Sequence, residues 1–441
     1  MLNRTDLDAL TAPIVPRERS WPSPLAALEV RNYRLYLSGQ VIATTGLWMQ
    51  RIAQDWLILE LTGSVAAVGI AVALQFTPVL LFGLLGGLIA DRYPKRRLLI
   101  ATQSVATSMA LILGILALTG AVQAWHVFLI ATVLGFVTVV DNPTRQVFVS
   151  ELVGRRHIRN AVSLNSSVFQ LGALIGPALS GLLITAVGQG WSFLINAAAC
   201  STVVVMLVII RPTINQLPSV ANRAKGQLRE GLSYIRRTSE VLWTIVLVGV
   251  MGVFGLNMPV VLAAFADHEF HLGVSGYSLF NSLTAIGALT GALISAHRTA
   301  TVRLRTLVTM VSMLGVALML ASMSPTVWMF GIVLVGIGLC TLLFLTGANS
   351  LVQLTSAPAV RGRVMSVYLL VLLGGQAVGS PIVGALIDII GVRPTMLSCG
   401  AIVALATLTA GLVMARQSHL TLAVDAQHPW SHPLRIVSTA R

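Results

Sequence analysis

The sequence predicts an all-α integral membrane protein in which twelve transmembrane helices form two six-helix parallel repeats. Hydrophobic residues make up 56% of the 441-residue chain and charged residues only 10%, whereas soluble proteins carry about 25% charged residues. The apolar runs reach membrane-spanning length and do not alternate, so helices rather than a β-barrel are expected in the lipid. A glycine-rich pattern also occurs once in each half of the chain, which indicates an internal repeat.

The apolar runs and the charged stretches between them divide the chain into five parts. We expect a cytoplasmic N-terminal arm at 1–32, a six-helix bundle at 33–210, a cytoplasmic linker at 211–238, a second six-helix bundle at 239–414 and a cytoplasmic tail at 415–441. The predicted spans are 33–61, 65–90, 97–118, 125–148, 160–187, 191–210, 241–265, 277–296, 303–323, 327–351, 363–390 and 394–414. The linker is expected to contain an interfacial amphipathic helix from Lys225 to Arg237.

The distribution of basic residues predicts the orientation. Of the 29 Lys and Arg residues, all but Arg51 and Arg393 fall at or near one set of termini and loops. Because cytoplasmic loops carry the excess of Lys and Arg, we expect a multi-pass protein of the plasma (inner) membrane with both termini in the cytoplasm. The net charge of +14 has the same origin, and no nucleic-acid partner is expected, since the basic residues do not form one patch.

The turn between the second and third predicted spans is short and basic. Its pattern Gly87-x-x-x-Asp91-Arg92-x-x-Lys95-Arg96 resembles the loop 2–3 signature of the major facilitator superfamily, with Pro94 where that family usually has Gly. Residues 25–415 resemble the drug:proton antiporter branch of twelve-span proteins that includes macrolide and enterobactin exporters. The segments that carry this wider resemblance are 31–35, 38–40, 46–51, 55–56, 141–146 and 361–365.

The fifth predicted span contains Gly172-x-x-x-Gly176-Pro177-x-x-Ser180-Gly181, which resembles the antiporter motif of proton-coupled exporters. The eleventh span repeats the pattern about 203 residues later, as Gly375-x-x-x-Gly379-Ser380-Pro381-x-x-Gly384. Small residues let helices approach closely, and a proline bends the span. The resemblance favours export over import, whereas tight helix packing alone would not specify a direction.

Ionisable residues within spans are costly unless they work or are paired. Arg51 and Asp55 lie one turn apart in the first span, so they could form an ion pair on one helix face. Asp55 could bind a proton when Arg51 moves away, which would make the two residues the proton-coupling pair. The alternatives are a static salt bridge and a residue that already lies at the outer interface.

A second charged pair, Asp141 and Arg145, lies near the cytoplasmic end of the fourth span. The family resemblance implies that this pair and the loop residues Gly87, Asp91, Arg92 and Arg96 form a conformational latch. That latch would hold the halves together when the cavity faces outward and release them when it faces inward. The alternative is a charge cluster that only sets the topology.

Cargo contacts are expected from the spans that line the cavity in the resembled superfamily, namely spans one, four, seven and ten. Their aromatic, Met and amide side chains suit a large amphipathic cargo, although each could instead serve packing. The candidates are Gln40, Thr44, Trp48, Met49, Gln50, Phe254, Asn257, Met258, Phe344, Thr346 and Asn349.

The sequence therefore predicts a secondary active transporter, which exports drugs or other amphipathic small molecules in exchange for protons by alternating access. Alternatives are a lysophospholipid or siderophore transporter on the same fold and, less favoured, a non-transporting membrane sensor. An enzyme is not expected, since G-x-S-x-G and H-E-x-x-H are missing, and neither Lys95 nor Lys225 follows a glycine as in an ATP-binding loop. We expect no metal or cofactor, because the three cysteines lie singly in apolar runs. The resemblance implies a monomer.

Overall fold

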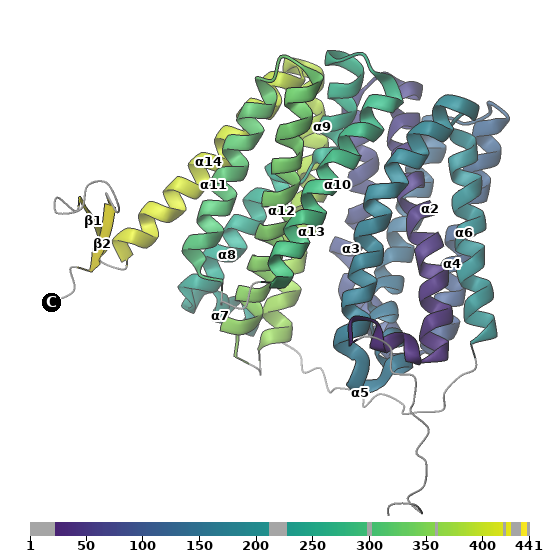
Figure 1. Ribbon diagram of the computed structural model, residues 1–441, viewed down its shortest axis with the longest axis horizontal. Helices are drawn as coiled ribbons and strands as arrows, with labels where there is room; N and C mark the ends of the chain where they lie inside the picture. The colour runs from purple at the N-terminus through teal and green to yellow at the C-terminus, as the bar shows by residue number, and fades with distance from the viewer. Residues whose placement is uncertain are drawn as a thin grey trace, which may run out of the picture.

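The computed structural model describes residues 23–210, 227–297, 302–357, 360–417, 420–424 and 434–438. Most of the expected N-terminal arm, the first part of the linker and much of the tail lie outside these residues. The described helices form two bundles that stand side by side, one from each half of the chain (Figure 1). Eleven described segments are long and apolar enough to cross a membrane.

The N-terminal half begins with a short 3₁₀ helix and contains five long helices. Their bounds are η1 (Ser23–Glu29), α2 (Arg31–Thr62), α3 (Val65–Arg92), α4 (Lys95–Leu118), α5 (Ala124–Val187) and α6 (Gln189–Ile209). Helix α5 contains two spans, because Gly154 adopts a φ of +67°, which glycine reaches without steric cost. The chain reverses there, so this half contains six spans.

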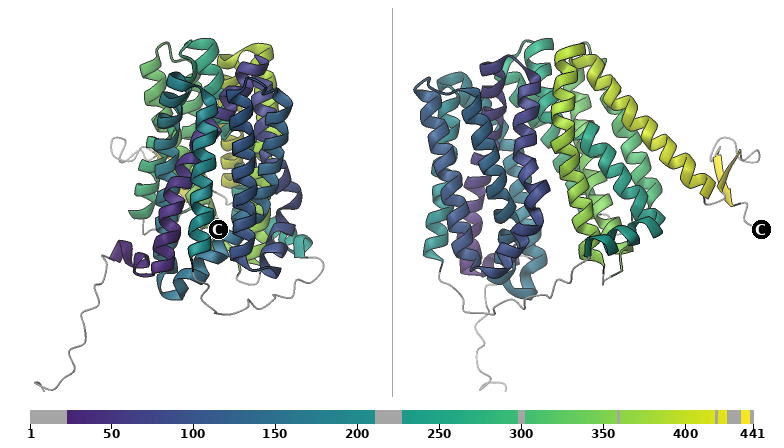
Figure 2. Two further views of the ribbon diagram at one scale, coloured as in Figure 1. Left: turned by 90° about the vertical axis from the view of Figure 1, so that its right-hand side faces the viewer. Right: turned by 180° about the vertical axis from the view of Figure 1, so that it is seen from behind.

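The C-terminal half begins with the linker helix and contains the other six spans. Its elements are α7 (Gln227–Arg237), α8 (Ser239–Val250), η2 (Met251–Gly255), α9 (Met258–Ala264), η3 (Phe265–Glu269), α10 (Gly273–His297), α11 (Leu304–Ser322), α12 (Val327–Thr355), α13 (Arg361–Ile390) and α14 (Val392–Gln417). The elements from α8 to η3 form one span with two π-helical turns. Helix α14 diverges from the bundle toward an antiparallel pair, β1 (Leu420–Val424) and β2 (Leu434–Ser438) (Figure 2).

Helix α2 is the twelfth span, although it is less apolar than the other eleven. Its 32 residues include Gln40, Gln50, Gln54 and Asp55, all of which are buried. Extensive packing against α5 and α6 keeps much of this polar helix away from lipid. The low hydropathy of α2 therefore reflects its position in the interior of the bundle. With α2 counted, the chain has twelve spans, and the twelve-helix prediction is confirmed.

The two glycine-rich patterns play matching roles, which confirms the two-repeat prediction. In the first half, a methyl group added at Gly176 would lie 2.5 Å from Cβ of Trp48 in α2. In the second half, a methyl group added at Gly375 would lie 2.8 Å from Cα of Gly252 in η2. Each pattern thus brings the fifth span of its half into close contact with the first span of that half.

The last glycine of each pattern faces the other half. A methyl group at Gly181 in α5 would lie 2.5 Å from Cβ of Ser278 in α10. The same group at Gly384 in α13 would lie 2.7 Å from the carbonyl oxygen of Val65 in α3. The seam between the halves is therefore formed by α5 with α10 and by α13 with α3.

The linker helix α7 is fixed to the C-terminal half. The hydroxyl of Tyr234 donates to the carbonyl oxygen of Thr355 over 3.1 Å and accepts from the amide of Ala357 over 3.2 Å. Ile235 beside it is only 4% exposed. The described helix starts at Gln227, and the expected start at Lys225 lies outside the described residues.

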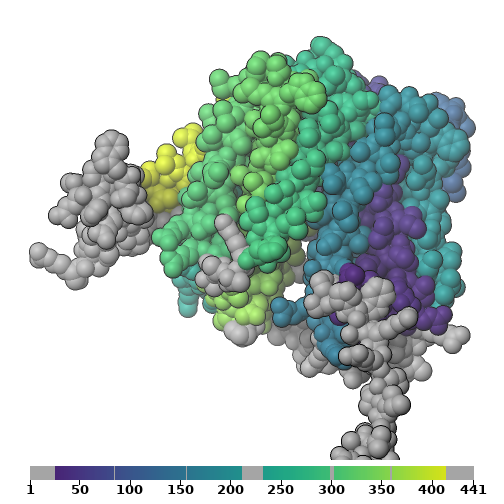
Figure 3. Space-filling view, in the orientation of Figure 1, coloured from purple at the N-terminus to yellow at the C-terminus, as the bar shows by residue number. Residues whose placement is uncertain are grey.

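The two ends of the bundle differ in how closely the halves meet. We call the end that carries Arg92, Lys95 and Arg361 the basic end, and the end that carries Thr62 and Ile390 the far end. Between residues 49 and 59 of α2, toward the far end, every side chain except that of Arg51 is buried. The halves meet at the top of the molecule, and a hollow separates them lower down, toward the basic end (Figure 3).

Exposure along one face of α2 supports the same conclusion. Arg34, Ser38 and Val41 are exposed and lie at helical spacing on the face that carries Asp55 farther along. This face is covered by the other half near Asp55 and is open near Arg34. The structure is therefore closed at the far end and open toward the basic end.

Candidate transport site

Asp55 lies at the seam between the halves. Asp55 is only 7% exposed, and its Oδ2 accepts a hydrogen bond of 2.8 Å from the hydroxyl of Tyr277 in α10. The ring of Tyr277 stacks on that of Trp56, with ring centroids 6.3 Å apart. An acidic side chain of the first half is thus held by a phenol of the second half, in the closed part of the seam.

Arg51 does not form the ion pair with Asp55 that their spacing allows, since within the described residues no nitrogen of Arg51 lies within 4.0 Å of that carboxylate. The guanidinium instead lies over the ring of Trp48, 4.9 Å from its centroid. A cation over an indole face is attracted by the ring quadrupole. In this conformation Arg51 is therefore positioned one helical turn from Asp55, on the side of the basic end.

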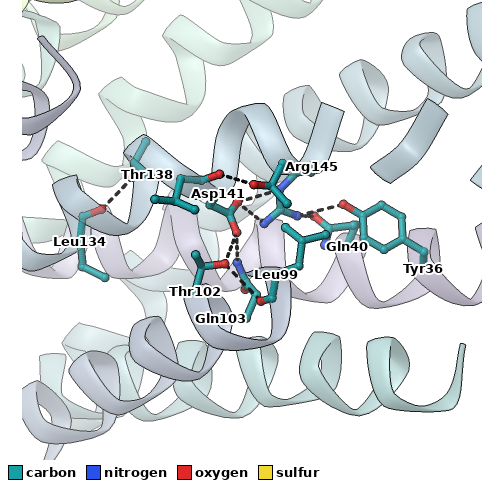
Figure 4. A network of polar contacts seen from close by, with 11 residues as sticks. Tyr36, Gln40, Leu99, Thr102, Gln103, Leu134, Thr138, Asp141 and Arg145 are labelled. Atoms are coloured by element: carbon teal, nitrogen blue, oxygen red, sulfur yellow. Dashed lines mark hydrogen bonds and ion pairs between the residues drawn. The ribbon is translucent and has the colours of Figure 1, made fainter. Parts of the chain in front are cut away.

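Asp141 and Arg145 come together as the sequence suggests, and they form a network within the first half (Figure 4). Oδ2 of Asp141 lies 2.6 Å from Nη2 of Arg145, and Oδ1 accepts from Thr102 and Gln103 of α4 at 2.8 and 3.0 Å. The guanidinium also donates to residues of α2, namely Tyr36 and Gln40. The pair therefore connects α2, α4 and α5, and these partners all lie in the first half.

The loop residues of the proposed latch lie at the basic end. Asp91 and Arg92 end α3 and are exposed, and Gly87 is half-buried one turn before them. Arg96 donates to the carbonyl oxygens of Leu207 and Val208 at 2.6 and 2.7 Å. These carbonyls belong to the last turn of α6, where a cation complements the helix dipole.

The candidate cargo residues of α2 fall on two faces. Thr44 and Trp48 pack against α5, at Gly172 and Gly176. Gln50 points into the first half, because it accepts from Asn196 of α6 and is 2% exposed, and Met49 is buried at 4% exposure. Gln40 belongs to the Arg145 network described above. Two buried donors, Nε2 of Gln40 and Nε1 of Trp48, have no hydrogen-bond partner among the described residues.

The candidates of the seventh span surround a break in that helix. Asn257 lies in the break and accepts a hydrogen bond of 2.7 Å from Ser380, while Gln376 donates to the carbonyl oxygen of Leu256. Phe254 and Met258, on either side, are half-buried. The polar residues of α13 thus satisfy the backbone and side chain at this break.

The candidates of the tenth span lie in the second half of the molecule. Phe344 is 0% exposed and belongs to the core of the second half. Thr346 accepts from Ser295 of α10, and Asn349 accepts from Gln353. Phe344 therefore packs within its own half in this conformation, and Thr346 and Asn349 are half-buried.

Two residues that contact the other half at the seam were not predicted from the sequence. Tyr277 is the first residue of a predicted span, where an aromatic residue is usually read as an interface anchor. Asp388 lies in the last turn of α13, and its carboxylate contacts the start of α3 in the other half. The signal available for Asp388 was an acid in the last turn of an otherwise apolar span.

Two six-helix repeats that are closed at one end, with an ionisable residue at their seam, define the class of secondary membrane transporters. The chain belongs to the transmembrane secretion effector family of the major facilitator superfamily, whose model matches residues 22–440. The superfamily and exporter branch predicted from the sequence are thereby confirmed. The family and the fold are those of membrane transporters and not of enzymes.

Curated relatives and solved structures agree with this membership. The enterobactin exporter EntS of Citrobacter koseri is 24% identical over 380 residues, which cover 83% of this chain and 88% of the exporter. The staphyloferrin A transporter of Staphylococcus aureus is 26% identical over 191 residues, 43% of this chain and 48% of that protein.

Among solved structures, a mutant of the nucleoside transporter NupG superposes with a TM-score of 0.70 at 11% identity, over 87% of this chain and 99% of NupG. A bacterial homolog of the human lysosomal transporter Spinster, in an inward-facing and unoccupied conformation, gives 0.69 at 14% identity, over 86% and 96%. These two structural similarities show the fold of the chain.

Proposed function

We propose that this protein exports an amphipathic small molecule in exchange for protons, as a monomer, with its basic end in the cytoplasm. The positive-inside rule supports this orientation. Arg393 is an exception to the clustering of basic residues at the basic end. It lies at the far end, where its Nε donates to Glu269 over 2.6 Å. The conformation described here then faces inward, because it is closed at the far end.

The observation that carries the proton-coupling proposal is the position of Asp55 in the closed seam. When the far end opens, the carboxylate is uncovered on the outer side and takes up a proton. Closing the seam removes this group from water, which costs free energy for a carboxylate unless it is compensated. Protonation and the Tyr277 donor both lower that cost, so the proton-bound carrier closes toward the inward-facing state.

Arg51 provides a route for release of the proton. It lies one turn closer to the basic end and rests on Trp48 in this conformation. When cargo enters and contacts Trp48, the guanidinium is displaced toward Asp55 and favours its charged form. Cargo and proton then bias one conformational equilibrium in opposite directions, which is the requirement for antiport.

The cargo class is proposed from the relatives and from the donors of α2. Both relatives described above are named for siderophores, enterobactin and staphyloferrin A. Siderophores are rich in hydrogen-bond acceptors, and the unpartnered donors of Gln40 and Trp48 lie on the span that faces the opening. These observations favour the siderophore alternative over a general drug exporter.

The charged loop residues of the basic end are proposed to form the conformational latch, which holds the two halves together at that end while the carrier faces outward. Asp91, Arg92 and Arg96 lie at the end where the halves must meet once the carrier faces outward. The substitution Asp91→Asn should then cripple transport without preventing membrane insertion. Normal transport by that variant would refute the latch.

Efflux from cells that overproduce the protein tests the proposed function. A catecholate siderophore, a carboxylate siderophore and an amphipathic dye are each loaded, and export is followed with and without an ionophore. We expect gradient-dependent export of at least one siderophore. Export that persists after collapse of the proton gradient would overturn the antiport proposal.

Proteoliposomes test Asp55 separately. Asp55→Asn should abolish uphill transport driven by a pH gradient but retain exchange of cargo across the membrane. Glu60→Gln, in the same helix and at the exposed end, is the matched control and should keep pH-driven transport. An unchanged pH dependence in Asp55→Asn would remove Asp55 from the coupling role.

A further inference from the structure

Asp388 joins the two halves at the far end. From the last turn of α13, its Oδ2 accepts from the hydroxyl of Ser64 over 2.6 Å and from the amide of Ala66 over 3.0 Å, and its Oδ1 accepts from the amide of Val65 over 2.9 Å. Ser64 is the N-cap residue of α3, and the two amides belong to the first two residues of that helix. A carboxylate of the second half therefore completes the N-terminal cap of a helix in the first half.

The capping of α3 is incomplete without the other half. The first amides of a helix have no partner within it and favour a negative charge nearby. The side chain of Ser64 caps the amide of Ala67, over 3.3 Å, which leaves the amides of Val65 and Ala66 to Asp388. Opening the far end separates α13 from α3, so those two amides must then bind water.

The fold itself does not require this carboxylate. The offset of 203 residues that relates Gly384 to Gly181 relates Asp388 to Thr185. The hydroxyl of Thr185 donates to the carbonyl oxygen of Gly181 in its own helix. The seam of α5 with α10 thus closes without an acid at the equivalent position, whereas the seam of α13 with α3 has one.

We propose that Asp388 is a positioning residue for transport, which latches the far end shut by capping α3 only while the carrier is closed there. The proposal rests on alternating access in the proposed function, but not on the identity of the cargo or on proton coupling. Loss of the charge should raise the ratio of far-end-open to far-end-closed carriers by about two- to fivefold, as expected for an exposed charge at a helix N-terminus.

Distances between spin labels on the purified full-length protein test this directly. Labels are placed at Thr119 and Met323, which are both exposed at the far end of different halves, after replacement of the three buried cysteines. Asp388→Asn and Asp388→Ala should shift the distance distribution toward the longer, open population, and Asp388→Glu should restore part of the closed population. Asp267→Asn, whose side chain is 42% exposed at the same end, is the control and should not change the distribution.

Two results would overturn the latch. One is an unchanged distance distribution in Asp388→Ala together with a lower thermal stability, which would make Asp388 a structural cap only. The other is an equal shift in Asp267→Asn, which would make the effect one of surface charge. Because the readout is distance and not transport, failure of the latch is distinguishable from failure of the proposed proton-coupled export.

Discussion

The hydroxyl of Tyr277 donates to Oδ2 of Asp55 across the seam between the halves, over 2.8 Å. Both residues are buried, with exposed fractions of 0% and 7%. A buried hydrogen bond is worth about 0.5–1.5 kcal/mol when its acceptor is neutral and about 1.5–3 kcal/mol when the acceptor is charged. This contact exists only while the far end is closed, so it stabilises one state of the carrier over the other.

Substitution of Tyr277 by Phe removes the donor and retains the ring that stacks on Trp56. We expect the population open at the far end to rise by about tenfold or more, because about 1.4 kcal/mol corresponds to a factor of ten. Labelling of a cysteine at the far end by a membrane-impermeant thiol reagent measures this population.

Tyr33→Phe is the matched control for that experiment. Its buried hydroxyl donates to the carbonyl oxygen of Ala161 over 3.0 Å, and both residues belong to the first half. The control loses a buried hydrogen bond without affecting the seam. An equal rise in labelling in both variants would show that Tyr277 has no special role in closure.

The fold was predictable because hydropathy and charge act along the whole chain. Long apolar runs, basic turns and the repeated glycines were sufficient to predict twelve spans and two repeats, and α2 was recognised even though its polar residues lower its hydropathy. The break at Gly154 falls between the predicted spans 125–148 and 160–187, although the helix continues on both sides of it.

The site was predictable only in part, because partners across the seam are set by packing. Spacing within one helix correctly joined Asp141 to Arg145. The same spacing suggested that Arg51 and Asp55 pair with each other. Instead, Arg51 lies over the indole of Trp48, and Asp55 accepts from the phenol of Tyr277 in α10. Contacts between segments hundreds of residues apart, such as that of Ser64 with Asp388, leave no local pattern.

Gly181→Ala tests whether close packing is needed at the seam of α5 with α10. The added methyl group would lie 2.5 Å from Cβ of Ser278, so the halves must separate locally. We expect slower transport and more labelling at the far end, since real Cβ contacts essentially never lie under 3.0 Å. Initial rates in proteoliposomes and thiol labelling measure the two effects.

Gly336→Ala provides the comparison for the glycine experiment. A methyl group there has no described atom within 4 Å, and the residue lies inside a span of the same half as Ser278. Transport and labelling should stay close to those of the parent protein. A Gly181→Ala variant that behaves like this control would contradict the close-packing role.

Asp141→Asn should destabilise the first half, because it leaves the guanidinium of Arg145 without its carboxylate. Loss of one partner costs about 3–5 kcal/mol in a fully buried pair, and less here, since the side chain of Arg145 is 27% exposed. We expect the midpoint of thermal unfolding in detergent to fall by about 5 °C. Asp267→Asn, from a pair with His268 in which both side chains are 42% exposed, should change the midpoint little, and equal effects would contradict the prediction.

Arg393 is the basic residue of the far end whose position the structure explains most fully. Its guanidinium donates to Glu269 over 2.6 Å and to the carbonyl oxygens of Ser322 and Ser324 over 2.9 Å, which fixes α14 to η3 and to the end of α11. Arg393→Gln should destabilise the second half by about 1–2 kcal/mol, a modest value because both charged side chains are about one third exposed.

Thermal unfolding in detergent, compared with that of Arg305→Gln, checks this value. Arg305 is an exposed residue of the same half at the basic end, so its substitution should leave the unfolding midpoint nearly unchanged. If Arg393→Gln unfolds at the same temperature as Arg305→Gln, the three contacts of Arg393 do not stabilise the far end. Retention of the midpoint by Arg393→Lys would instead assign the stabilisation to charge alone, since lysine lacks the planar fork that reaches three acceptors at once.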